Sequence, residues 1–311
     1  MKKRVLVVSS ANMDFVMKMK KLPEAGQTIV EERGYSYVPG GKGANSALAF
    51  ARLGADSVFC ARVGADVNGK KLKELYDSNG IDTRFMKIDR LNPTGLASII
   101  VEESGANRII VYPGANAAMS EDDVEDALTC LPDAVFLQFE IPDAAAIAAA
   151  KFAAKRSIPV FVDAGPARQD TPLEKFPRLE VISPNESETL ALTGIYPNDS
   201  ANCLRAANEI LKRVEAKYVV IKLGGRGAYI HDGKFSQLIP AIESEVVDTT
   251  AAGDAFTAAL TLEYLNSGDI VKAVRYANVV GSIVVGKAGA STSLPTAAEV
   301  GEFIRRRGIT F

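Results

Sequence analysis

Short apolar runs alternate with longer amphipathic segments along most of this chain. The apolar runs are rich in β-branched and aromatic residues, as in Arg4-Val-Leu-Val-Val-Ser9, and such runs predict buried strands. We expect these strands at residues 4–9, 57–63, 134–139, 159–163, 181–183 and 218–222, and a hairpin at 227–240. Helical periodicity predicts helices at residues 44–53, 70–78, 144–154, 200–214, 253–266 and 269–285, the last two closing the chain. The alternation predicts an α/β fold with a central, mostly parallel sheet and helices on both faces.

Two segments interrupt this alternation. Residues 94–112 hold two β-rich runs around the glycine-containing turn 103–106, which predicts a hairpin. Residues 15–39 are mixed in polarity, and we expect short, half-exposed strands there. We therefore assign residues 15–39 and 94–112 to a small separate sheet, and residues 1–14, 40–93 and 113–311 to one α/β domain.

Composition narrows the classes of function open to this chain of 311 residues. A net charge of −2 argues against nucleic acid as a partner, because nucleic-acid binding needs a basic surface. No apolar stretch reaches the ~18–20 residues of a membrane span, and the run 5–8 is too short for a secretion signal. The 3 cysteines lack metal-binding spacing, and the cytoplasm is the expected location. Since His231 is the single histidine, catalysis would use carboxylates, lysines or backbone dipoles.

The segment Asp248-Thr-Thr-Ala-Ala-Gly-Asp254 combines an anion site with an acid. Small residues lead directly into an amphipathic helix, so backbone N–H groups at the helix N-terminus are open to an anion. Asp254 stands in the first helical turn, beside that site. A carboxylate there could take a proton from a hydroxyl that attacks a phosphoryl group. The alternative is an ordinary first-turn acid that stabilises the helix.

Two motifs together resemble those of one enzyme family. Gly40-Gly-Lys-Gly-Ala-Asn45 resembles the N-terminal motif of the ribokinase family, the pfkB-type carbohydrate kinases, and residues 248–254 resemble its C-terminal motif. The resemblance extends from residue 4 to residue 305. It implies a ribokinase-like fold and transfer of the γ-phosphoryl group of ATP to a primary hydroxyl, with O5 of D-ribose as the expected acceptor. In this reaction Asp254 would be the base, and the amides of Ala251, Ala252 and Gly253 would stabilise the developing charge.

Two alternatives remain open at this point. The chain could phosphorylate another sugar or a nucleoside, as fructokinases, adenosine kinases and pseudouridine kinases of the same family do. It could also be a non-catalytic protein that binds a sugar. The presence of Asp254, Gly253 and Glu188 argues against the non-catalytic alternative, because a protein that only binds sugar has no need of a base.

The family resemblance also assigns the sugar-binding positions. They are Asn12, Asp14, Gly41, Lys42, Asn45, Glu140 and Asp254. A carboxylate and an amide can chelate adjacent hydroxyls, and Glu140 follows a predicted strand at its carboxyl end, where ligands bind in such folds. Each position also has a local explanation: Asn12 and Asp14 fit a polar turn, the glycine motif fits a helix cap, and Glu140 fits an exposed acid.

The resemblance further assigns a nucleotide and two cations. The nucleotide-binding residues are Asn185, Lys222, Gly224, Gly225, Gly227, Gly253 and Asn278. Glu188 of the Asn-x-x-Glu motif would organise Mg²⁺ through water, although the segment also fits a plain helix start. Potassium, a monovalent activator, would bind at Asp248, Thr250, Val284, Lys287, Gly289 and Ser293.

The small sheet has an expected role in this reaction. We expect it to act as a lid that closes on the sugar and excludes water, because water competes as a phosphoryl acceptor. A sheet with an apolar face usually needs a partner, so we also expect a homodimer formed through the lid.

Overall fold

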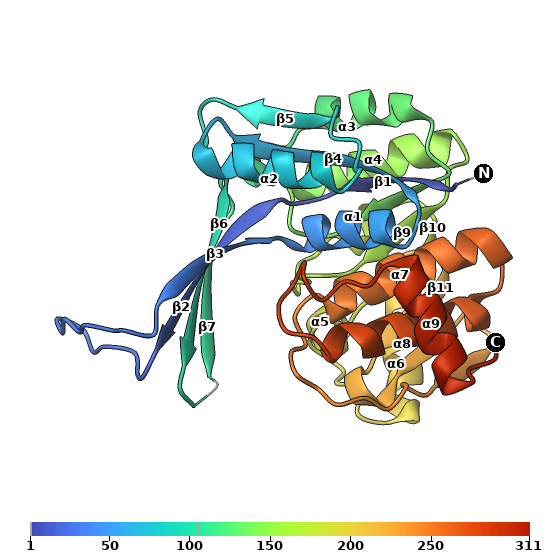
Figure 1. The fold of residues 1–311 in the computed structure, drawn as a ribbon. Coiled ribbons are helices and arrows are strands. Elements are labelled where there is room, and N and C mark those ends of the chain that lie inside the picture. Colours follow the sequence, from blue (N-terminus) through green and yellow to red (C-terminus); the bar gives the residue numbers. More distant parts are fainter. Residues whose placement is uncertain (1, 105) are drawn as a thin grey trace.

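The strand β1 (Arg4–Val8) lies inside the molecule, with other strands on both sides of it. The computed structural model describes residues 2–104 and 106–311. In it β1 belongs to a nine-stranded sheet with the order β13-β12-β11-β10-β9-β8-β1-β4-β5, whose pairings are parallel except those of β12. The other strands are β4 (Asp56–Gly64), β5 (Met86–Asp89), β8 (Ala134–Leu137), β9 (Val160–Asp163), β10 (Leu179–Ser183), β11 (Ala216–Lys222), β12 (Ala228–His231) and β13 (Ser236–Ile239). The predicted α/β fold with a mostly parallel sheet is confirmed (Figure 1).

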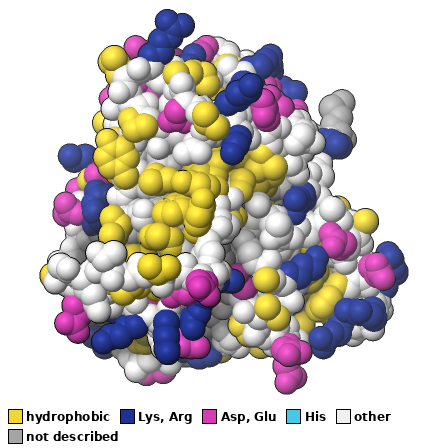
Figure 2. Space-filling model, turned by 60° about the vertical axis from the view of Figure 1, so that its left-hand side comes forward, with side chains coloured by type: hydrophobic (Ala, Val, Ile, Leu, Met, Phe, Trp, Pro, Cys, Tyr) yellow, Lys and Arg dark blue, Asp and Glu magenta, His cyan; other side chains and the backbone are white. Residues whose placement is uncertain are grey.

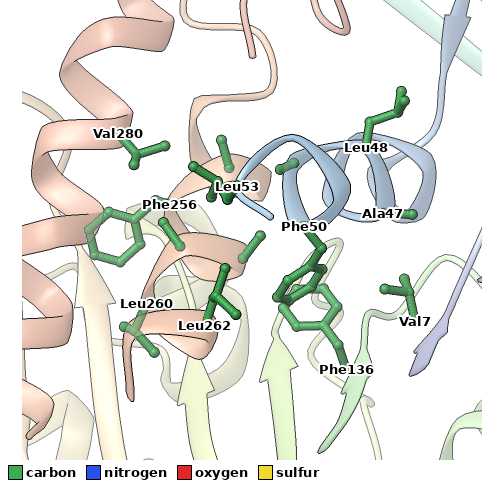
Figure 3. Packing of buried hydrophobic residues seen from close by; sticks show 14 of the residues in the cluster. Val7, Ala47, Leu48, Phe50, Leu53, Phe136, Phe256, Leu260, Leu262 and Val280 are labelled. Atoms are coloured by element: carbon green, nitrogen blue, oxygen red, sulfur yellow. The ribbon is translucent and has the colours of Figure 1, made fainter. Parts of the chain in front are cut away.

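Helices cover both faces of this sheet and enclose two apolar cores. One core includes residues of α1 (Lys42–Arg52), α2 (Val67–Ser78), α7 (Ala252–Ser267), α8 (Ile270–Val285) and α9 (Ala297–Arg307). The other includes residues of α3 (Glu121–Ala127), α4 (Asp143–Lys155), α5 (Glu186–Thr193) and α6 (Ser200–Arg213). In the first core Phe50 of α1 meets Phe136 of β8 edge-on, 5.2 Å between ring centroids (Figure 3). Within the described residues, no helix is both long and apolar enough to span a bilayer.

The predicted strands and helices are present, but three elements lie where the sequence analysis places none. These elements are β5, α3 and α9, whereas α5 begins at the segment that also fitted a plain helix start. The prediction that two helices close the chain is therefore wrong, because α9 follows α8. Thr296 and Glu299 form a capping box at the start of α9, but Val300 is the one residue of this helix that is buried. The helix is nevertheless amphipathic, and both this periodicity and the Thr-x-x-Glu capping spacing are sequence signals that the prediction did not use.

A four-stranded small sheet projects from the body that the nine-stranded sheet and its helices form (Figure 1). Its strands, in spatial order, are β3 (Tyr35–Gly40), β2 (Asn12–Met19), β6 (Gly95–Glu102) and β7 (Asn107–Tyr112). The sheet is mixed, because β2 and β6 are parallel and the outer pairs are antiparallel. β2 starts at Asn12, ahead of the expected start at residue 15, since Asn12 pairs with both Gly40 and Gly95.

Apolar side chains of the small sheet are open to solvent. The side chains that are more than half exposed are Tyr35, Tyr37, Ile109, Ile110, Val111 and Tyr112. Figure 2 turns the side with the small sheet forward and shows a broad hydrophobic area there. Exposed apolar patches are typical of surfaces that bind a protein, a membrane or a ligand.

Candidate active site

The start of α7 presents backbone N–H groups that the protein leaves free. Ala251, just before α7, has a φ of 63°, a left-handed conformation that is uncommon for a residue other than glycine. The N–H groups of Gly253 and Asp254 have no backbone acceptor among the described residues. The N–H of Ala252 donates to the carbonyl of Thr249 at 3.2 Å, which corrects the expectation that this amide is free. A helix N-terminus with free N–H groups attracts an anion.

Asp254 lies in the first turn of α7, and hydrogen-bond donors hold both of its oxygens. Asn45 of α1 donates to Oδ2 at 2.8 Å, and Gln138, just after β8, donates to Oδ1 at 3.4 Å. The ammonium group of Lys42 lies 3.9 Å from Oδ1. Burial raises the pKa of Asp254 to about 6, against the opposing charge of Lys42. Such a carboxylate is ionised at neutral pH and can still accept a proton.

The start of β2 carries two of the predicted sugar ligands. The side-chain oxygen of Asn12 accepts a hydrogen bond from Asn116 at 2.7 Å, which fixes the orientation of the Asn12 amide. Asp14 lies two residues further along the strand, on the same face. Its carboxylate lies against Gly40, where a Cβ atom would be 2.0 Å away from it. Burial, together with the nearby charge of Glu140, raises the pKa of Asp14 to about 7.

The glycine motif and Glu140 hold the start of α1 against the end of β1. Glu140 accepts hydrogen bonds from the backbone N–H of Lys42 at 3.0 Å and from the hydroxyl of Ser10. Gly41 has a φ of 91°, and a Cβ atom there would lie 2.9 Å from the backbone N of Asn12. The glycine is therefore required by close packing of the chain on itself, in addition to any approach of a sugar. Glu140 likewise anchors α1, a role that the sequence analysis did not predict.

A cavity of about 760 Å³ opens beside the N-terminus of α7. Its lining contains every residue predicted to bind the nucleotide, namely Asn185, Lys222, Gly224, Gly225, Gly227, Gly253 and Asn278. Gly227 has a φ of 98°, and a Cβ atom there would lie 2.0 Å from the carbonyl oxygen of Ile239, so this loop requires glycine. The NH₂ group of Asn278 donates to the carbonyl of Pro240 at 2.9 Å, which ties α8 to the end of β13. The volume is that of a pocket for a small organic ligand.

A buried ion pair lies next to this cavity. Lys222, the last residue of β11, pairs with Asp163, the last residue of β9. Neither Asp163 nor Gln138 was predicted as a site residue, because neither belongs to a local motif. Both lie at or just beyond the carboxyl ends of parallel strands, where ligands bind in open α/β sheets. That position is the signal that could have identified them.

Asn185 and Glu188 form a capping box at the start of α5. Glu188 Oε2 accepts a hydrogen bond from the N–H of Asn185, and Asn185 Oδ1 accepts one from the N–H of Glu188, both at 2.8 Å. The plain helix start that the sequence also allowed is therefore present. Glu188 Oε1 faces Gly165, where a Cβ atom would lie 2.3 Å from it. Among the described residues, no three His, Cys, Asp or Glu side chains are grouped as a metal site.

Two loops bring together part of the group predicted to bind potassium. Asp248 accepts hydrogen bonds from the hydroxyl of Thr250 at 2.6 Å and from the N–H of Gly289 at 2.9 Å. In the part of the chain that the structure describes, no Lys, Arg or His side chain pairs with the Asp248 carboxylate. An ionised carboxylate of this kind is a ligand that a hard cation prefers, but the groups that contact Asp248 among the described residues are hydrogen-bond donors and not cation ligands.

Three residues of the potassium group already have other partners. The carbonyl of Val284 accepts a hydrogen bond from the N–H of Lys287 at 3.1 Å, and the Lys287 ammonium pairs with Glu299 at 2.9 Å. The hydroxyl of Ser293 donates to the carbonyl of Ala290 at 2.7 Å. The side chain of Lys287 therefore points to an ion pair, and contacts from this loop to a cation would come from backbone carbonyls.

Comparison with known proteins decides the family. The sequence matches the pfkB family carbohydrate kinase over residues 2–297. The chain belongs to this family. This pfkB kinase is 33% identical over 306 residues to a ribokinase of Haemophilus influenzae, covering 98% of this chain and 99% of that protein. The family and the fold class predicted from the sequence are both confirmed.

Two further relatives extend the comparison. The pfkB kinase is 36% identical over 297 residues to a bifunctional ribokinase/ribose-5-phosphate isomerase A of Fructilactobacillus sanfranciscensis, of which it spans 55%. It also superposes on the structure of Arabidopsis thaliana ribokinase complexed with ribose and ATP with a TM-score of 0.89. That match has 32% identity and covers 98% of this chain and 99% of the other.

Proposed function

We propose that this chain is an ATP-dependent ribokinase that transfers the γ-phosphoryl group to O5 of D-ribose. One observation carries the proposal: buried Asp254 contacts two predicted sugar ligands, Lys42 and Asn45, and directly follows Gly253, whose free amide belongs to a residue that lines the cavity. The ribokinase relatives, one of them solved with ribose and ATP, support this choice of substrates.

Asp254 acts as the general base in this proposal. Its pKa of about 6 leaves it ionised at neutral pH, so it can take the proton from the attacking hydroxyl. The free N–H groups of Gly253 and Asp254 stabilise the charge that develops on the transferred group. Asn45 and Gln138 orient the carboxylate through its two oxygens. Sugar hydroxyls bind to Asn12, Asp14, Gly41, Lys42, Asn45 and Glu140.

Charge around the site supports a requirement for Mg²⁺. Five carboxylates (Asp14, Glu140, Asp163, Glu188 and Asp254) face two ammonium groups, those of Lys42 and Lys222. A triphosphate would add more negative charge, and Mg²⁺ would neutralise part of it. Glu188 would hold the ion through water, which agrees with the preference of Mg²⁺ for few protein ligands. Potassium would bind at Asp248, whose carboxylate has no Lys, Arg or His partner among the described residues, with carbonyl oxygens of the loop that contains Gly289.

The small sheet is the proposed lid, and its apolar surface is the proposed dimer contact. β2 carries Asn12 and Asp14 at its base, so movement of the small sheet would also move two sugar ligands. The exposed apolar side chains of β3 and β7 would be covered by the same surface of a second copy. The cysteines Cys60, Cys130 and Cys203 are free and buried, which agrees with a reducing cytoplasm.

A substrate panel tests the proposed function. ADP release would be measured with ribose, deoxyribose, fructose, adenosine and pseudouridine, each with and without K⁺. We expect the highest kcat/KM with ribose and a gain in rate with K⁺. Turnover confined to another acceptor would assign the chain to a different kinase of the family. Tight ribose binding in calorimetry without any ADP release would instead identify a sugar-binding protein.

A further inference from the structure

The buried ion pair Asp163–Lys222 spans three neighbouring strands of the body. Lys222 ends β11 and Asp163 ends β9, and β10 lies between them. Both side chains are almost fully buried, with residue exposures of 9% for Lys222 and 2% for Asp163. Burying two charges carries a large desolvation cost, so a buried pair is weak evidence for a purely stabilising role.

The position of the Lys222 ammonium group points to the reacting phosphate. Nζ lies 3.7 Å from the place where a Cβ atom on Gly253 would be, at the N-terminus of α7. It also lies 3.3 Å from the hydroxyl of Thr257, one turn further along this helix. Lys222 and Gly253 both line the cavity, and the free N–H of Gly253 lies at the helix N-terminus that the ammonium group approaches. The Lys222 ammonium group and the Gly253 N–H thus lie close together at a helix N-terminus where an anion is expected.

Lys217, a second lysine of β11, forms an ion pair that serves as a comparison for the pair of Lys222. Lys217 pairs with Glu180 of β10 at 2.7 Å and also contacts the hydroxyl of Tyr264. The Lys217 side chain is 40% exposed, against 10% for Lys222. Lys217 lies toward the opposite end of the strand and does not line the cavity. The two pairs therefore have similar chemistry but different access to the site.

We propose that Lys222 is a further catalytic residue that contacts the phosphoryl group in flight, and that Asp163 is the positioning residue that holds its ammonium group beside Gly253. This inference rests on the proposed function and adds a side-chain cation to the amides of α7. Asp163 limits the rotamers open to Lys222, so the positive charge is in place before the substrate arrives.

The charges of Asp163 and Lys222 also affect the pKa of the proposed general base, Asp254. Asp254 is faced by Lys42 and Asn45 from α1, by Gln138 beyond β8, and by the pair itself from β9 and β11. The charge of Asp163 raises the pKa of Asp254, and the charge of Lys222 lowers it. Loss of Asp163 and loss of Lys222 should therefore displace the acidic limb of the pH profile in opposite directions.

Three variants and one control test this proposal. The variants are Lys222→Met, Asp163→Asn and the double variant, and the control is Lys217→Met. For each protein we would measure kcat, the melting temperature and, at saturating ribose, the pH dependence of kcat/KM for ATP. We expect Lys222→Met to lower kcat on the order of 10²-fold and to move the acidic limb up in pH. We expect Asp163→Asn to lower kcat less and to move the limb down. The double variant removes both charges, so its melting temperature should recover from that of Lys222→Met while its kcat stays low.

Ligand binding adds a readout that does not depend on turnover. Calorimetry would compare ADP alone with ADP plus aluminium fluoride and ribose in MgCl₂, because the fluoride complex mimics the transferred phosphoryl group. The proposal narrows the nucleotide contact of Lys222 to the transferred phosphoryl group, so Lys222→Met should keep its ADP affinity and lose most of the gain from aluminium fluoride. Lys217→Met should keep both. Recovery of kcat together with the melting temperature in the double variant, or an unchanged gain from aluminium fluoride in Lys222→Met, would overturn the proposal. Failure of the proposed function differs from both, since the unmodified protein would then release no ADP with ribose.

Discussion

The strands β1 and β7 have similar apolar sequences and opposite environments. In β1 the residues Val5–Val8 are fully buried, whereas in β7 all six residues, Asn107–Tyr112, are exposed. The body covers its strands with its own helices on both faces, and the small sheet projects away from those helices (Figure 1). A β-rich run therefore predicts a strand, but the layers around the strand decide whether its side chains form a core or a contact surface.

Because of this difference, we expect the body to determine folding stability and the small sheet to determine assembly. The body can fold on its apolar cores, while the apolar side chains of the small sheet contribute little until a sugar or a second copy covers them. The proposed active site lies at the junction, with Asp254 in the body and Asp14 at the base of the small sheet. Substitutions in the two regions should therefore have different kinds of effect.

The largest effect on stability is expected in the body. Phe136→Ala removes a fully buried ring that packs edge-on against Phe50, and should lower the free energy of unfolding by about 3–5 kcal/mol. Ile110→Ala in β7, whose side chain is 67% exposed, should change it by less than about 0.5 kcal/mol in the monomer. Urea denaturation at low protein concentration measures both. A loss of similar size in the two variants would contradict the comparison.

A charge on the small sheet should act on assembly rather than on folding. Ile110→Glu should raise the dissociation constant of the proposed dimer by roughly 100-fold, because an unpaired charge in an apolar interface costs several kcal/mol. Sedimentation velocity across a concentration series measures the change. Leu91→Ser is the matched control, since this side chain is 93% exposed and lies outside the small sheet. An unchanged sedimentation coefficient for Ile110→Glu would contradict the proposal that the small sheet forms the dimer contact.

A smaller effect is expected from the pH dependence of sugar binding. The pKa of Asp14 is raised to about 7 by burial and by Glu140, so Asp14 gains its charge as the pH rises from 6 to 8. An ionised carboxylate accepts hydrogen bonds from sugar hydroxyls more strongly, and KM for ribose should therefore be roughly tenfold higher at pH 6 than at pH 8. Asp14→Asn should raise KM and flatten this dependence. If the variant kept the slope of the unmodified protein, another group would be responsible.

Much of the fold and the site could be predicted from local patterns. The helix start at Asp254 and the glycine motif at Gly41 are visible because the residues that matter are adjacent in the sequence. The nucleotide-binding residues, by contrast, follow from the family resemblance, and they line one cavity. The helix α9 is amphipathic and starts with a capping box, so its absence from the prediction does not reflect a missing local signal.

Other parts of the site depend on contacts that sequence spacing does not report. Gln138, Asp163 and Asn116 reach the site from separate elements, and each acts on a partner far away in the sequence. The hydrogen bond from the Ala252 N–H to the Thr249 carbonyl accompanies a left-handed backbone conformation at Ala251. An alanine in the sequence does not predict that conformation. The position of each residue in the folded chain decides these roles. The tendency of ligands to bind at the carboxyl ends of parallel strands is the one sequence signal that points to Gln138 and Asp163.

The central claim is that Asp254 takes the proton from the attacking sugar hydroxyl, and the kcat of Asp254→Asn tests it most directly. The variant keeps the shape of the side chain and removes the base, so kcat with ribose and ATP should fall by at least ~10²–10⁴ while ADP affinity in calorimetry stays close to that of the unmodified protein. A kcat within a few-fold of the unmodified value, with normal substrate binding, would contradict the account.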